Sequence, residues 1–78
     1  MYYVYAIKSL NRNYLYVGLT NNPERRINQH NEGRERTTRT YAPFRTLIVE
    51  NFSTRVDARN REKYLKSGIG KEYLKSLI

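Results

Sequence analysis

The 78-residue sequence has no cysteine, no long apolar run and few acidic residues. Without cysteine, neither a disulfide framework nor a thiolate metal site can stabilise the fold, so its compactness must come from packing. No window approaches the length of a membrane-spanning helix, and the N-terminal stretch MYYVYAIKSL is too short for a signal peptide with its cleavage site. We therefore expect a soluble, cytoplasmic protein without a membrane partner, built as a single domain over residues 1–78.

Basic residues, in contrast to acidic ones, are abundant in this sequence. Fifteen Lys and Arg against seven Asp and Glu give a formal net charge of +8. In so short a chain this excess sets up a positive field over much of the surface, which favours polyanions such as nucleic acid. A surface that is basic for solubility, or a ribosome-associated RNA-binding protein, would carry the same charge, and tyrosine-rich strands would suit stacking on RNA bases. Composition leaves these alternatives open.

Polar turns separate short periodic segments in the order strand, strand, helix, strand, helix, helix. The pattern predicts strands at about residues 2–8, 14–19 and 44–52. A first helix is expected from Pro23, with Asn22 as its cap and Gly33 just beyond its end. A second helix is expected to begin after the cap residue Thr54 and to run to about Ser67. The final segment GIGKEYLKSLI predicts a short closing helix that packs through one stripe of residues, Tyr73, Leu74, Leu77 and Ile78.

The first two strands should form an antiparallel hairpin. If Asn11 and Arg12 form its turn, Tyr5 pairs with Gly18 and Ile7 pairs with Tyr16. Strand alternation then gives one face of core residues (Val4, Ala6, Leu15, Val17 and Leu19) and a second face that holds Tyr3, Tyr5, Tyr14, Tyr16 and Gly18. The missing side chain of the glycine leaves space opposite a tyrosine. Either the tyrosines simply cover this face and the glycine marks a bulge, or the space belongs to a site.

The first helix presents a cation and an imidazole together. Arg26 and His30 are four residues apart and project from one helix face beside Ile27, which should anchor the helix to the sheet. A guanidinium can bind two phosphate oxygens, and a histidine can donate to a third or carry a proton. Taken singly, Arg26 could equally be a solvated arginine and His30 an ordinary helix-end residue.

The loop from Gly33 to Tyr41 is polar and basic. Its Arg34, Arg36 and Arg39 suit contacts with a nucleic-acid backbone, as does Lys8 at the end of the first strand. A charged, solvated loop would explain the same residues.

Glu62 falls on one stripe of the second helix with Ala58 and Leu65, which places a carboxylate on the buried side. Because burying an unpaired charge is costly, Glu62 needs a partner. Lys66, four residues on, would give an exposed pair worth about 0.3 to 0.5 kcal/mol. A divalent cation is the other partner, because Mg²⁺ often takes one or two carboxylates and completes its shell with water and substrate phosphate.

Four segments in this order resemble the GIY-YIG nuclease superfamily: YVY at 3–5, YVG at 16–18, NNPERRINQH at 21–30 and ARNREKYLK at 58–66. The similarity covers nearly the whole chain and is greatest to small stand-alone bacterial members. The sequence departs from the family pattern at Tyr3, where relatives have glycine. It also has no match for the asparagine found near the end of some relatives. The resemblance implies an α+β fold, a three-stranded antiparallel sheet flanked by helices, and an endonuclease that hydrolyses DNA phosphodiesters with one Mg²⁺, for which Mn²⁺ can substitute.

Carried over by position, the resemblance implies catalytic roles for Tyr5, Tyr16, Arg26, His30 and Glu62, with Gly18 supporting the second motif. Glu62 would hold the metal, Arg26 would neutralise transition-state charge, and Tyr5 would take a proton from the attacking water. A tyrosine can do this at neutral pH only if positive charge, from the metal, Arg26 and Lys8, lowers its pKa. The alternatives are a non-catalytic nucleic-acid-binding module, a component that needs a protein partner, and a basic RNA-binding protein.

Overall fold

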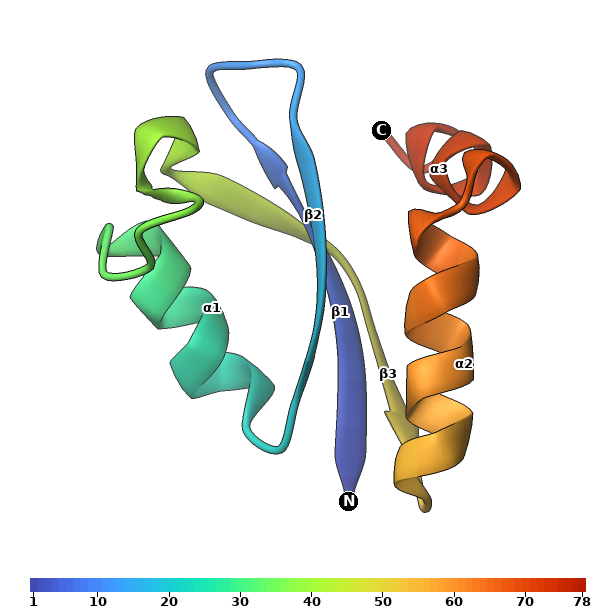
Figure 1. The fold of residues 1–78 in the computed structure, drawn as a ribbon. Helices are drawn as coiled ribbons and strands as arrows, with labels where there is room; N and C mark the ends of the chain where they lie inside the picture. Colours follow the sequence, from blue (N-terminus) through green and yellow to red (C-terminus); the bar gives the residue numbers. More distant parts are fainter.

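The computed structural model describes all 78 residues as one antiparallel sheet with helices on both sides (Figure 1). None of the helices has the length and apolar character that a membrane span requires. The sheet order is β2-β1-β3, so β2 and β3 are its edges. The predicted α+β order of elements is confirmed. Its strands are β1 (Tyr2–Ser9), β2 (Leu15–Thr20) and β3 (Phe44–Phe52), and its helices are α1 (Pro23–Asn31), the 3-10 turn η1 (Arg39–Tyr41), α2 (Arg55–Lys66) and α3 (Gly68–Lys75).

The hairpin has the predicted register. Tyr5 lies opposite Gly18 and Ile7 lies opposite Tyr16, with no register shift between β1 and β2. Gly18 therefore does not mark a bulge, and that alternative is wrong. The irregularity in the sheet lies instead between Ala6 and Ile7, where β1 pairs with β3.

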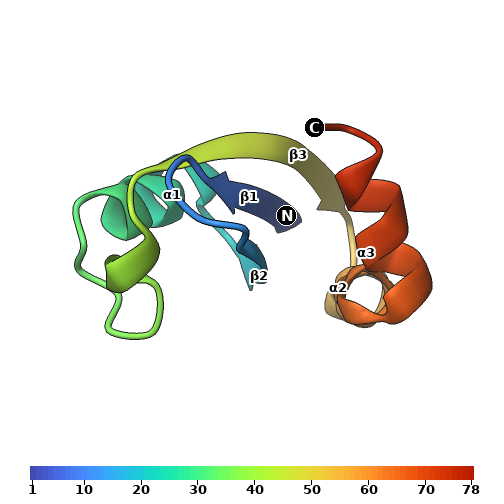
Figure 2. The same cartoon turned by 90° about the horizontal axis from the view of Figure 1, so that it is seen from above.

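Alternation along the strands produces a separate core on each face of the sheet. On one face, Val4, Ala6 and Val17 pack against side chains of α2 and α3, chiefly Leu65 and Leu74. On the other face, Tyr5, Ile7 and Phe44 form a smaller cluster against which Ile27 of α1 packs. Figure 2 shows the result from above: α1 and η1 lie to one side of the strands, α2 and α3 lie to the other, and the edge strand β2 lies between them.

Side-chain caps set the starts of the three α-helices. Asn22 accepts a hydrogen bond from the backbone N–H of Arg25, and Thr54 accepts one from Asp57. Both caps were predicted, and each is worth about 1 kcal/mol. Ser67 ends α2 and caps α3 by accepting from the N–H of Gly70, so one residue serves both helices.

The prediction of a packing stripe in the closing helix is right for Leu74 alone. Leu74 is fully buried, whereas Tyr73, Leu77 and Ile78 are 39%, 39% and 56% exposed. For Leu77 and Ile78 the reason is that α3 ends at Lys75, so the helical period does not extend to them. Tyr73 instead lies beside the guanidinium of Arg61, 5.7 Å from its ring centroid.

The close contact between α2 and α3 depends on a glycine. A Cβ added at Gly70 would overlap the carbonyl oxygen of Tyr64 and lie 2.5 Å from the Cα of Leu65. Both are backbone atoms of α2, which cannot move aside as a flexible side chain can. Gly68, two residues earlier, has open space around it.

We predict that Gly70→Ala destabilises the protein by about 1 to 3 kcal/mol, because overpacking forces the two helices apart. The matched control is Gly68→Ala, which should leave the free energy of unfolding unchanged within about 0.5 kcal/mol. Urea unfolding followed by circular dichroism measures both. Equal stability of the two variants would contradict the close packing at Gly70.

Candidate active site

Side chains from three segments meet on the face of the sheet that α1 covers. Tyr5 comes from β1, Tyr16 from β2, and Arg26 and His30 from α1. The His30 ring centroid lies 4.8 Å from that of Tyr16 and 5.7 Å from that of Tyr5. The structure thus brings together four of the five side chains to which the resemblance gives catalytic roles.

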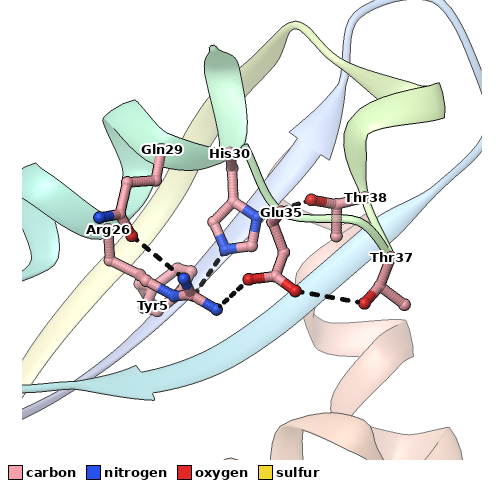
Figure 3. A network of polar contacts seen from close by, with 7 residues as sticks. All are labelled: Tyr5, Arg26, Gln29, His30, Glu35, Thr37 and Thr38. Carbon is pink, nitrogen blue, oxygen red and sulfur yellow. Dashed lines mark hydrogen bonds and ion pairs between the residues drawn. The ribbon is translucent and has the colours of Figure 1, made fainter. Parts of the chain in front are cut away.

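A buried hydrogen-bond chain runs through this group (Figure 3). The Tyr5 hydroxyl lies 2.8 Å from Nε2 of His30, and Nδ1 of His30 lies 2.7 Å from the hydroxyl of Thr38. All three side chains are at most 1% exposed. Thr38 belongs to the loop before η1, and sequence reasoning assigned it no role. No periodic pattern marks it, because its contact with His30 is made only by the folded loop.

Gly18 allows the Tyr5 ring to occupy its position. A Cβ added at Gly18 would lie 2.5 Å from the Tyr5 hydroxyl oxygen and 2.6 Å from Cζ of the same ring. The expectation that this glycine leaves free space is therefore wrong, because the phenol itself fills the space. The glycine instead brings the Tyr5 hydroxyl close to the backbone of the edge strand.

The environment of Tyr5 opposes ionisation. Burial and the neighbouring Tyr16 raise the pKa of Tyr5 to about 12, and the positive charge of Arg26 offsets only part of this. Lys8 does not contribute, since its ammonium donates to the carbonyls of Ser9 and Arg12 in the hairpin turn. Tyr5 is therefore a neutral phenol at physiological pH, and it cannot act as a phenolate base in this state.

Arg26 is held at the surface in a fixed orientation. Its guanidinium donates to Gln29 at 3.1 Å and to the Glu35 carboxylate at 2.7 Å, and its side chain is 32% exposed. In return, the Arg26 charge holds the pKa of the Glu35 carboxyl below its usual range. A guanidinium has five N–H donors, so others remain for a ligand. Glu35 was missed in the sequence, although it is the one acidic residue in the loop from Gly33 to Tyr41.

His30 is neutral near pH 7. Burial lowers its pKa, and the Arg26 charge lowers it further. A neutral imidazole has one donor and one acceptor nitrogen, so the chain has a direction. Either Tyr5 donates to Nε2 while Nδ1 donates to Thr38, or both hydrogen bonds are reversed.

Tyr16 is the tyrosine that a ligand can reach. It lies on the edge strand β2, its side chain is partly exposed, and its hydroxyl takes part in none of the hydrogen bonds of the cluster. Its ring packs beside Tyr5 and His30. The site therefore has a buried layer, the chain through His30, and an exposed layer formed by Tyr16 and Arg26.

Glu62 is not part of this cluster. It lies on α2, whose residues Ala58 and Leu65 pack on the opposite face of the sheet. Its carboxylate oxygens accept from Arg59 and Lys66, each at 3.2 Å, and its side chain is 9% exposed. The predicted pair with Lys66 is present, and Arg59 adds a second cation. In both views β2 lies between α1 and α2, the helix that carries Glu62 (Figures 1 and 2).

The donor set limits how a metal ion could be held. No group of three or more His, Cys, Asp or Glu side chains lies close enough together to form a protein-only metal site. Glu62 alone fits an ion such as Mg²⁺, which commonly takes one or two carboxylates and fills its shell with water and substrate phosphate. The cations Arg59 and Lys66 would then have to release the carboxylate oxygens that the ion uses.

The basic loop residues are at the surface. Arg34 pairs with Glu32 at 3.0 Å, whereas Arg36 and Arg39 are exposed and form no ion pair. They are accessible to a polyanion, and their role in contacting nucleic acid stays a prediction.

Comparison with known proteins identifies the family. A family model described as the GIY-YIG catalytic domain matches residues 1–73, and the chain belongs to this nuclease family. A UPF0213 protein of Clostridium perfringens is 40% identical over 67 residues, which cover 85% of this chain and 71% of that one. The solution structure of a UPF0213 protein from Bacillus halodurans matches with a TM-score of 0.58 and 33% identity, covering 97% of this chain and 83% of the other. The expected family and fold are confirmed.

A third relative has a name that describes its activity. A protein of Giardia intestinalis named as a structure-specific endonuclease subunit homologue is 53% identical over 47 residues. The match covers 55% of this chain but 13% of that protein. The similarity is therefore confined to a small part of the Giardia protein.

The lowered His30 pKa predicts how stability depends on pH. In the unfolded chain the pKa of His30 is near its ordinary value of 6.5, whereas in the folded chain this pKa is lower. The contribution of His30 to stability should therefore be complete above about pH 6.5 and be lost as the pH falls below it, by at most about 1.4 kcal/mol per pH unit. Glu35 has a lowered pKa too, so its contribution falls only below its ordinary value of 4.5.

Urea unfolding between about pH 5 and pH 8 isolates the histidine, because few other side chains titrate in that range. Wild type should lose stability toward pH 5, and His30→Gln, which cannot titrate, should have a flatter profile. The same slope in both proteins would mean that the His30 pKa is not lowered.

Proposed function

We propose that this protein is a divalent-metal-dependent endonuclease that hydrolyses phosphodiester bonds in DNA. The observation that carries the proposal is the two-layer site at the β2 edge. Its exposed layer offers a guanidinium and a phenol with free donors, and its buried layer fixes a neutral imidazole behind them. Binding of a nucleic-acid backbone alone would need lysine and arginine but no such buried chain.

Arg26 would bind a non-bridging oxygen of the scissile phosphate. Its charge and its planar donors suit phosphate, and the negative charge that grows on the phosphoryl oxygens in the transition state would strengthen the contact. Glu35 and Gln29 keep the guanidinium in place before substrate arrives. A phosphate would use the remaining N–H groups or replace the Glu35 carboxylate.

Tyr16 would orient the attacking water through its free hydroxyl. Attack forms a bond between the water oxygen and phosphorus and breaks the bond to the leaving sugar oxygen. The water proton would pass to the Tyr5 oxygen while Tyr5 gives its own proton to Nε2 of His30, so no phenolate is needed. Because Tyr5 is buried, substrate binding would have to open the layer over its hydroxyl to the attacking water. This relay requires Nε2 to be the acceptor nitrogen, which is the arrangement in which Nδ1 donates to the Thr38 hydroxyl.

Glu62 would hold the metal ion, since it is the carboxylate that fits one. When bound, Mg²⁺ or Mn²⁺ would supply Lewis-acid stabilisation of charge on the phosphate and on the leaving oxygen. Arg59 and Lys66, which neutralise Glu62 in its absence, would be released toward the substrate.

The proposal predicts which side chains cleavage requires. Arg26→Gln, Tyr16→Phe and Glu62→Gln should each lower the rate by about 10²-fold or more, because each removes a contact made to the reacting groups. Arg25→Gln and Glu72→Gln are matched controls at exposed positions and should keep the wild-type rate. Labelled single-stranded, duplex, flapped and branched DNA, and RNA, incubated with Mg²⁺ or with chelator, provide the assay.

Each outcome of this assay decides between the alternatives. Cleavage that survives chelation or Glu62→Gln would overturn the metal-dependent mechanism. Binding without cleavage on every substrate would favour a non-catalytic module or a component that needs a protein partner. Cleavage of RNA in preference to DNA would overturn the assignment of the substrate.

Thr38 should act as a positioning residue. Thr38→Val leaves Nδ1 of His30 without a hydrogen-bond partner, which destabilises the tautomer with a protonated Nδ1 that the relay needs, and the cleavage rate should fall about tenfold or more. Thr38→Ser keeps the hydroxyl and should restore most of the rate. In wild type the rate should also fall in acid as His30 becomes protonated, and this fall should occur at a lower pH than the ordinary histidine value of 6.5, because burial lowers the His30 pKa. Equal rates for the valine and serine variants at equal folded fraction would exclude the positioning role.

A further inference from the structure

The contacts that α2 makes with the sheet show in which direction each side of this helix faces. Ala58 and Leu65 point into the core, and Arg61 makes two hydrogen bonds, of 2.8 and 3.2 Å, to Glu50 on β3. With 3.6 residues per turn, the side chains on the other flank of α2 face away from β3. Since the sheet order is β2-β1-β3, that flank faces the β2 edge, where the candidate active site lies.

The side chains on this flank are cationic. We call the following set the cationic flank: Arg55, Arg59, Lys63 and Lys66 of α2, with Lys71 and Lys75 of α3. All six are exposed. Arg59 and Lys66 pair with Glu62, and the other four make no ion pair with any carboxylate. The two lysines of α3 line an open hollow of about 260 Å³ with Asn13, Tyr14 and Leu15, at the start of β2.

No acidic residue lines either hollow of the cationic flank. The second hollow, of about 340 Å³, is lined by Arg55, Arg59 and Lys63 together with Val56 and Asn60. The largest hollow on the molecule, over the outer face of α1, differs because Glu24 and Glu32 lie among its cations. The two hollows of the cationic flank therefore present positive charge to solvent with no carboxylate in their lining.

We propose that the cationic flank binds the phosphate backbone of the nucleic acid. It lies on the side of the active site away from Arg26, so the phosphates that it contacts are remote from the cleaved bond. From Arg55 to Lys66 the flank extends about 16 Å along the helix axis. One strand of duplex DNA has a phosphate every 3.4 Å or so of its axis, so this length matches about five nucleotides. Lysine and arginine contacts to phosphate carry no sequence information, so binding here should be independent of sequence.

This inference rests on the proposed nucleic-acid substrate, but its test does not depend on cleavage. The test variant is Lys63→Gln/Lys71→Gln, which leaves Arg59 and Lys66, and so the environment of Glu62, intact. The matched control is Arg25→Gln/Arg45→Gln, which removes the same charge from exposed positions on α1 and β3. Binding to a fluorescein-labelled DNA duplex of arbitrary sequence is measured by anisotropy in chelator over a series of salt concentrations.

The test variant should bind about tenfold or more weakly at about 0.1 M salt, and its slope of log K against log salt should be shallower by about 1.8 units, or 0.9 for each lost phosphate contact. The control should lose less than threefold. Equal losses in the two variants would mean that net charge alone drives binding and would overturn the proposal, as would wild-type affinity of the test variant. If wild type binds as expected here but cleaves nothing, the proposed function fails while this surface stands.

Discussion

The hydrogen bond between Tyr5 and His30 joins the sheet to helix α1, and the geometry of the site depends on it. It is formed in a fully buried place, where an unpaired hydroxyl or imidazole would cost about 1 to 3 kcal/mol. The bond therefore fixes the rotation of α1 on the sheet and, with it, the position of Arg26 one turn earlier. Gly18 makes the bond possible by leaving the Tyr5 hydroxyl room against β2. A site at the surface is thus positioned by a contact beneath it.

Local signals in the sequence were sufficient for most of the fold. The cap residues Asn22 and Thr54 act within three residues of themselves, so the helix starts follow from the sequence alone. The β3 segment at 44–52 is an uninterrupted strand-like run between turns, and its bounds agree with the structure. The hairpin register follows from the length of its turn. The stripe failed at Leu77 and Ile78 because a helical period does not indicate that the helix ends at Lys75.

The candidate site was predictable only in part, because its parts are joined by contacts that are distant in sequence. Spacing on one helix placed Arg26 and His30 on the same face, and strand alternation placed Tyr5 and Tyr16 together. The contacts of Thr38 and Glu35 depend on how the loop after α1 folds back over the sheet, and no pattern encodes this. Glu62 lies across the sheet from the other residues because α2 packs on the opposite face. The stripe with Ala58 and Leu65 predicted that its carboxylate is buried, but not on which face of the sheet.

The exposed edge of β2 has a further consequence for how copies of the protein behave toward one another. An unpaired edge strand with the sequence LYVGLT can in principle add a strand from a second molecule, which is a common route to aggregation. An approach that places the two α2 helices side by side would bring two cationic flanks together, and their like charges would repel at close range. Positive charge beside the edge therefore disfavours strand addition of this kind and favours the approach of a polyanion.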